Sequence, residues 1–108
     1  MKTRLIAAAL ALGLAAPAGA QELVFPSLDY RTGPYAPGGI PFADGYHDYF
    51  ELLNRRDGGI GGVPVRVLPC ETGYNTEKGV ECYESTKGEG VLVYQPLSTG
   101  STYHLIPK

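Results

Sequence analysis

The chain has 108 residues, with 9 Lys and Arg against 11 Asp and Glu, so its formal net charge is −2. This length has room for one small domain. The mild negative charge, without a basic run or an Arg/Lys stripe, argues against a nucleic-acid partner and against an amphipathic membrane anchor.

The first twenty residues are typical of a secretory signal peptide. Lys2 and Arg4 precede an apolar run over residues 5–16, and small residues occupy positions 18–20. The apolar run is too short to span a bilayer, so we expect no stable membrane insertion. We predict cleavage before Gln21 and export of residues 21–108 to the periplasm.

Two cysteines, Cys70 and Cys82, both follow the signal peptide. An exported chain meets an oxidising compartment, so a disulfide between them is the expected state. Their spacing fits neither a zinc knuckle nor a Cys-x-x-Cys redox pair. Two buried free thiols are the alternative.

The first half of the mature chain predicts a strand, a long loop and a helix. Residues 23–28 form the strand, and Pro26 implies a bulge or an early end because it lacks an N–H. Residues 29–39 form the loop, and residues 40–57 form the helix, which Gly58 ends.

The two faces of this helix are predicted from its periodicity. The face toward the sheet carries apolar and small residues, namely Phe42, Gly45, Tyr46, Tyr49, Leu52 and Leu53. The face toward solvent carries polar residues, namely Asp44, His47, Asp48, Glu51 and Arg55. A solvated face explains His47 and its acidic neighbours more simply than a metal site, so we predict no metal.

The second half repeats the pattern. A strand over 63–68 precedes a helix that Asn75 caps, a short apolar strand over 91–94 follows, and residues 98–102 begin another helix. The order is βαβαβ, an α/β, three-layer, Rossmann-like arrangement. Right-handed crossovers place the first strand between the other two.

The ends of the first and third strands then flank a crevice where loops 29–39 and 95–102 meet. The hydroxyls of residues 98–102 could bind an anion there, and an ordinary capped turn is the alternative. The sequence carries no Gly-x-Gly-x-x-Gly, phosphate loop or Gly-x-Ser-x-Gly motif. His104 lies near Ser98 and Ser101, but no placed acid completes a triad. We therefore predict a binding protein, with no catalytic residue and no cofactor.

Three stretches together resemble one family. They are residues 32–39, residues 53–62 with the pattern Asn-x-x-x-Gly-Gly-Ile-x-Gly, and residues 95–102. They look like the start of the periplasmic solute-binding proteins of ABC importers for branched-chain amino acids, amides or urea. The resemblance implies a type I periplasmic-binding fold, a small polar ligand and an ABC permease as partner. Those proteins have two lobes and are much longer, so residues 21–108 would be the N-terminal part of the first lobe, incomplete at its C-terminus.

The resemblance also implies site residues. The loop after the third strand would bind a ligand carboxylate through the Thr99 hydroxyl, with Ser98 and Gly100 beside it and Thr102 on the same turn; Tyr35 is a weaker candidate. Two features depart from the family: Gln95 stands where Gly is usual, and the cysteine pair is not general.

Other classes of function remain open at this point. A ligand-sensing extracellular domain of the same fold, attached to a receptor, is the main alternative. A small exported enzyme and a free-standing domain that only mediates protein contacts are further alternatives. The missing catalytic motifs argue against the enzyme.

Overall fold

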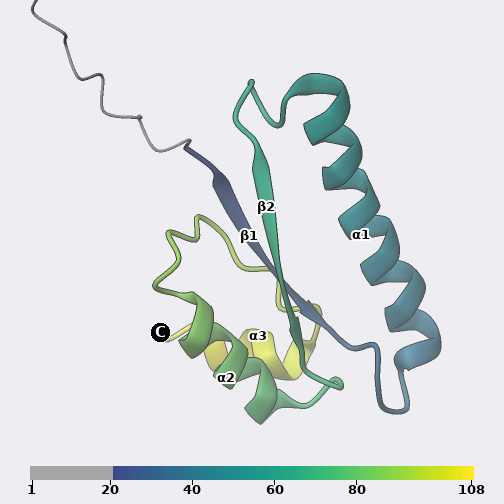
Figure 1. Cartoon of the computed structure of the whole chain (residues 1–108). Coiled ribbons are helices and arrows are strands. Elements are labelled where there is room, and N and C mark those ends of the chain that lie inside the picture. The colour runs from purple at the N-terminus through teal and green to yellow at the C-terminus, as the bar shows by residue number, and fades with distance from the viewer. Residues whose placement is uncertain (1–20) are drawn as a thin grey trace, which may run out of the picture.

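The computed structural model describes residues 21–108, so the predicted signal peptide over residues 1–20 lies outside the described residues. The described chain contains two strands and three helices (Figure 1). In chain order they are β1 Leu23–Asp29, α1 Ala36–Asp57, β2 Val65–Glu71, α2 Thr76–Thr86 and α3 Thr99–Leu105.

Strands β1 and β2 pair in parallel, from Leu23 opposite Val65 to Asp29 opposite Glu71. The expected bulge or early end at Pro26 is wrong, because the register runs through it without a break. The Leu23 N–H donates to the Pro64 carbonyl at 2.9 Å, so the odd-numbered residues of β1 turn their backbone groups toward β2. The backbone of Pro26, which has no N–H, therefore faces the side of β1 away from β2.

The stretch expected as a third strand lies on that other side. It contacts β1 only through two parallel bridges, Val24 with Val91 and Ser27 with Gln95. The predicted position beside β1 is confirmed, but the regular strand over 91–94 is not formed. Pro26 lies between the two bridged positions of β1, where it cannot donate to a ladder.

Side-chain contacts define three layers. Phe25 of β1 stacks on Phe50 of α1, with ring centroids 5.2 Å apart. Cys70 of β2 points the opposite way and is bonded to Cys82 of α2. Helix α1 therefore covers one face of the strands, and α2 with α3 covers the other (Figure 1). This arrangement agrees with the predicted α/β class.

Helix α1 begins at Ala36, four residues before the expected start at 40. Pro37 fits the first turn, where its missing N–H costs nothing. Gly39 is required there, since a Cβ at that position would lie 2.1 Å from the Tyr30 carbonyl oxygen. The helix ends as predicted, with Gly58 left-handed at φ 70°.

The predicted buried face of α1 is only partly right. Tyr46 and Leu53 are half-buried as expected, but Phe42, Tyr49 and Leu52 are exposed. The residues buried against the strands are instead the small Gly39 and Ala43, which let the helix approach closely. His47, expected in solvent, lies on this inner side.

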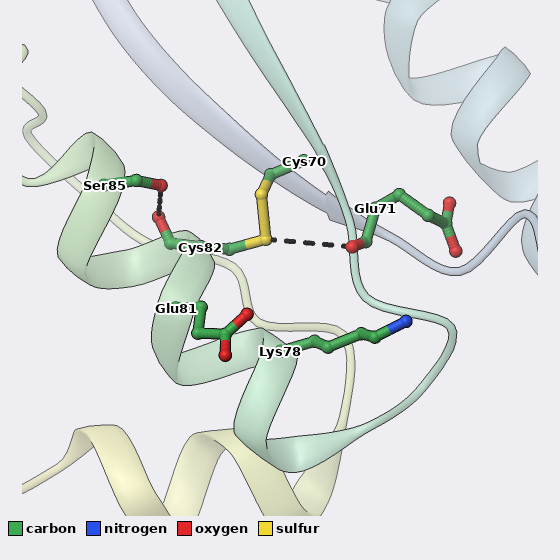
Figure 2. Close-up of a pocket in the computed structure, with 6 residues that line it drawn as sticks. All are labelled: Cys70, Glu71, Lys78, Glu81, Cys82 and Ser85. Carbon is green, nitrogen blue, oxygen red and sulfur yellow. Dashed lines mark hydrogen bonds between the residues drawn. A yellow bond between two sulfur atoms is a disulfide. The ribbon is translucent and has the colours of Figure 1, made fainter.

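The cysteine pair joins β2 to α2. Cys70 and Cys82 form a disulfide whose Cα atoms are 5.8 Å apart, within the range that a disulfide requires (Figure 2). Cys82 lies on the buried face of α2. The bond therefore fixes the end of β2, and the loop that follows it, against the helix.

Residues 21–108 taken alone are expected to lack a cooperative unfolding transition. The buried hydrophobic residues that form the core of the described chain are few: Val24, Leu28, Ala43, Val65 and Cys82. Leu92 and Val93 are 70% and 51% exposed along an incomplete edge, which invites pairing between copies. Calorimetry on the purified monomer should give a broad, weak transition and aggregation on heating; a sharp, reversible transition would contradict this.

Candidate functional site

The loops that follow β1 and β2 are tied together by one carboxylate. Glu71 accepts from the backbone N–H groups of Arg31 at 2.9 Å and Gly73 at 2.8 Å, and from the Thr32 hydroxyl at 2.9 Å. Burial alone would raise the pKa of Glu71, but these hydrogen bonds outweigh it and lower the pKa. The ionised carboxylate therefore holds the two loops side by side.

A buried threonine completes this junction. The Thr72 hydroxyl donates to the Asp29 carbonyl at 2.8 Å and accepts from the Tyr74 N–H at 3.2 Å. Tyr74 takes the left-handed conformation with φ 62°, which residues other than glycine adopt at a cost of about 1–2 kcal/mol. The network around Thr72 holds Tyr74 in this conformation.

Tyr74 is the centre of an aromatic cluster. Its ring centroid lies 4.5 Å from that of Tyr35, at the start of α1, and 5.1 Å from that of Tyr30, at the end of β1. The interplanar angles are 48° and 77°. These tilted and edge-on arrangements are the ones that aromatic rings prefer.

Helix α3 rests on α2 through small residues. A Cβ on Gly79 would lie 2.3 Å from the Ser101 Oγ, and a Cβ on Gly100 would lie 2.5 Å from the Thr76 Oγ1. A side chain at Gly100 would therefore displace the Thr76 hydroxyl, whether or not a ligand is bound. This crossing places the start of α3 near the loop that carries Tyr74.

The hydroxyls at the start of α3 have different roles. Ser98 is the N-cap, and its Oγ accepts from the Ser101 N–H at 3.4 Å. The Thr102 hydroxyl donates to the Ser98 carbonyl at 2.8 Å. Thr99 is exposed, and within residues 21–108 its hydroxyl makes no hydrogen bond. Thr99 thus offers a hydroxyl that the local backbone does not use.

Two shallow depressions meet at Tyr74. The first, of about 390 Å³, brings together residues of three segments: Tyr74, Gln95, Leu97, Ser98, Thr99, Thr102 and Tyr103. The second, of about 310 Å³, lies at the start of α1 and is lined by Tyr30, Pro34, Tyr35, Pro37, Gly38 and Tyr74. Loops 29–39 and 95–102 therefore do not meet in one crevice as predicted: each lines its own depression, and Tyr74, from the loop after β2, lies between them.

The predicted site residues are divided between these depressions. Ser98, Thr99 and Thr102 line the first, Tyr35 lines the second, and Gly100 lines neither. Tyr74 was missed by sequence reasoning. Its surroundings, Gly73 and Asn75, indicate only a turn and a helix cap, so no local signal distinguishes it from an ordinary loop residue.

A charged network lies beneath the loop after β1. The Asp29 side chain is buried and accepts from the Ser27 hydroxyl. Its Oδ2 lies 3.5 Å from the His47 Nε2 and 3.7 Å from the Arg31 Nε. His47 is therefore part of an internal network rather than the solvated face expected for it. Among residues 21–108, no group of three or more His, Cys, Asp or Glu side chains is placed to hold a metal ion.

A third depression, of about 410 Å³, lies between β2 and α2 (Figure 2). The disulfide and charged or polar side chains surround it, namely Cys70, Glu71, Lys78, Glu81, Cys82 and Ser85. It contains none of the predicted ligand-binding residues and no aromatic ring. The depressions at Tyr74 are therefore the better candidate for a ligand site.

Comparison with known proteins gives two matches. Residues 23–107 match the family model described as periplasmic binding protein. The chain is also similar to the crystal structure of an ABC transporter permease from the Pseudomonas fluorescens group, with 41% sequence identity and a TM-score of 0.75. That alignment covers 81% of this chain and only 22% of the other chain. No curated protein matches the chain.

Proposed function

Because this chain belongs to the periplasmic binding protein family, we propose that it serves solute uptake as part of the substrate-binding component of an ABC transporter. In this proposal, residues 1–20 are a cleaved signal peptide and residues 21–108 are the N-terminal part of the first lobe. The ligand is an amino acid, an amide or a urea-like solute. The family is one of binding proteins rather than enzymes.

The similar structure is much longer than this chain, which is consistent with this chain being one part of a larger protein. This chain spans about 22% of the length of that protein, which is described as an ABC transporter permease. We assign this chain to the substrate-binding component because its family match is to binding proteins, and a permease would be its partner. Within the described residues, none of the helices is long and apolar enough to cross a membrane.

The observation that carries the proposal is the free hydroxyl of Thr99. It lines the same depression as Tyr74, while the hydroxyls of Ser98 and Thr102 are engaged with the backbone of α3. In the proposed site, Thr99 donates to a carboxylate or amide oxygen of the ligand. Ser98, Gly100 and Thr102 shape the turn that presents it, and Tyr35 contacts the ligand from the start of α1.

Thr99→Val is expected to weaken ligand binding by roughly one to two orders of magnitude. The change keeps the shape of the side chain and removes one hydrogen bond, which is worth about 1.5–3 kcal/mol when the acceptor is a carboxylate. The measurement is calorimetric titration of the full-length protein that carries this segment, against branched-chain amino acids, small amides and urea.

Thr86→Val serves as the matched control. The Thr86 hydroxyl bonds to α2 and to Tyr94, so the variant loses a hydroxyl outside both depressions and should bind like the wild type. Equal affinities of wild type and Thr99→Val would remove Thr99 from the site.

A further inference from the structure

We infer that Tyr74 selects the ligand of this site, and that the ligand carries a flat ring beside its carboxylate or amide group. The inference rests on the function proposed above and adds the class of ligand. Four observations lead to it: backbone strain, the network that fixes the ring, the aromatic lining and the neighbouring polar groups.

The strain is concentrated at the first depression. Within residues 21–108, the residues other than glycine with positive φ are Tyr74 at 62° and Leu97 at 57°. Both line the same depression, although they are 23 positions apart in the chain. Strained backbone is retained where the surrounding structure enforces it, and it gathers at binding sites.

The network around Tyr74 fixes the position of its ring without burying it. Glu71 and Thr72 hold the backbone on either side of Gly73, and the rings of Tyr30 and Tyr35 pack against Tyr74. Tyr74 is nevertheless 36% exposed. A ring that is held rigidly and left partly open can receive another ring at little cost in conformational entropy.

The lining of the first depression matches a ring with a polar end. Tyr74 and Tyr103 supply aromatic surface, and Leu97 supplies apolar surface. Thr99 and Gln95 supply hydrogen-bonding groups at the same depression. Aromatic rings attract one another beyond the burial of their area, so these walls favour a planar ring over a branched aliphatic group of similar size.

The test compares two pairs of probes that differ in planarity: benzoate with cyclohexanecarboxylate, and L-phenylalanine with L-leucine. In calorimetric titration, the full-length wild type should bind the planar member of at least one pair roughly fivefold to tenfold more tightly. This comparison needs no variant. Equal or reversed affinities within both pairs would overturn the inference.

Two variants then assign the preference to Tyr74. Tyr74→Leu keeps an apolar side chain and should bring the affinities of the preferred pair within about twofold of each other. Tyr74→Phe keeps the ring and should retain the wild-type ratio. If Tyr74→Leu retains that ratio, Tyr74 is not the selecting residue and the inference is wrong.

The outcomes separate this inference from the proposed function. If L-leucine binds in a manner that depends on Thr99, and neither pair shows a planar preference, the function stands and the role of Tyr74 falls. If a planar preference depends on Tyr74 while Thr99→Val has no effect, the selection by Tyr74 stands and the proposed carboxylate contact falls. Absence of binding by amino acids, benzoate, amides and urea alike would overturn both.

Discussion

Gly59→Ala is expected to destabilise the full-length protein by about 3 kcal/mol or more, making it the most damaging single change considered. Gly59 has φ 102°, a region that side chains avoid, and an added Cβ would lie 1.8 Å from the Val63 carbonyl oxygen. The Val63 backbone cannot move aside as a flexible side chain could. The cost of the positive φ and the cost of the steric overlap therefore add. Urea unfolding of wild type and variant measures the loss.

Gly45→Ala is the matched control for this substitution. Gly45 lies inside α1, and a Cβ there would meet no atom within 4 Å. Alanine is the better helix former, so this variant should gain about 0.5–1 kcal/mol. A Gly59→Ala protein as stable as the wild type would show that the turn at 58–62 can rearrange, contrary to the packing described above.

Removing the disulfide is expected to cost about 3 kcal/mol. Cys70 and Cys82 are 12 positions apart, and closing a loop of this length restricts the unfolded chain by about that amount. Urea unfolding of the full-length protein, comparing the double variant Cys70→Ala/Cys82→Ala with the oxidised wild type, measures this loss of stability.

A reductant provides the internal control for the disulfide. Dithiothreitol should lower the stability of the wild type toward that of the double variant and leave the double variant unchanged. If reduction leaves the stability of the wild type unchanged, the bond between β2 and α2 contributes nothing to the fold.

The structure of the turn at 58–62 follows directly from its residues. Asn54 donates through its amide to the Val65 carbonyl at 2.7 Å and accepts from the Val65 N–H at 2.8 Å, which joins the last turn of α1 to the start of β2. Gly59 permits the close return of the chain between them. Each position of this motif has a local physical requirement, so the residues predict the structure directly.

The strand order, the end of α1 at Gly58 and the capping of α2 by Asn75 could also be predicted, because they depend on the handedness of crossovers and on local signals. The failure at 91–94 has a non-local cause. Pro26 removes a donor from the side of β1 that this stretch approaches, and only the register shows which side that is. The inner face of α1 was missed for a similar reason, since close approach favours Gly39 and Ala43 over larger apolar residues.

The candidate site was only partly predictable. Its hydroxyls follow an apolar stretch and stand out in the sequence, but nothing there separates the capping role of Ser98 from the free hydroxyl of Thr99. Tyr74 reaches the start of α3 because α3 packs on α2 at Gly79, while Glu71 and Thr72 hold the Tyr74 loop against the loop after β1. Such contacts across the chain are visible in three dimensions alone.

Hydrogen exchange of the full-length protein, with and without the tightest-binding carboxylate among the probes above, tests the central claim most directly. The account predicts slower amide exchange at residues 97–103 and 72–75 when the ligand is bound, with residues 50–57 of α1 unchanged as an internal reference. Binding that leaves both of the first two segments unchanged and protects other parts of the chain would contradict the proposed site.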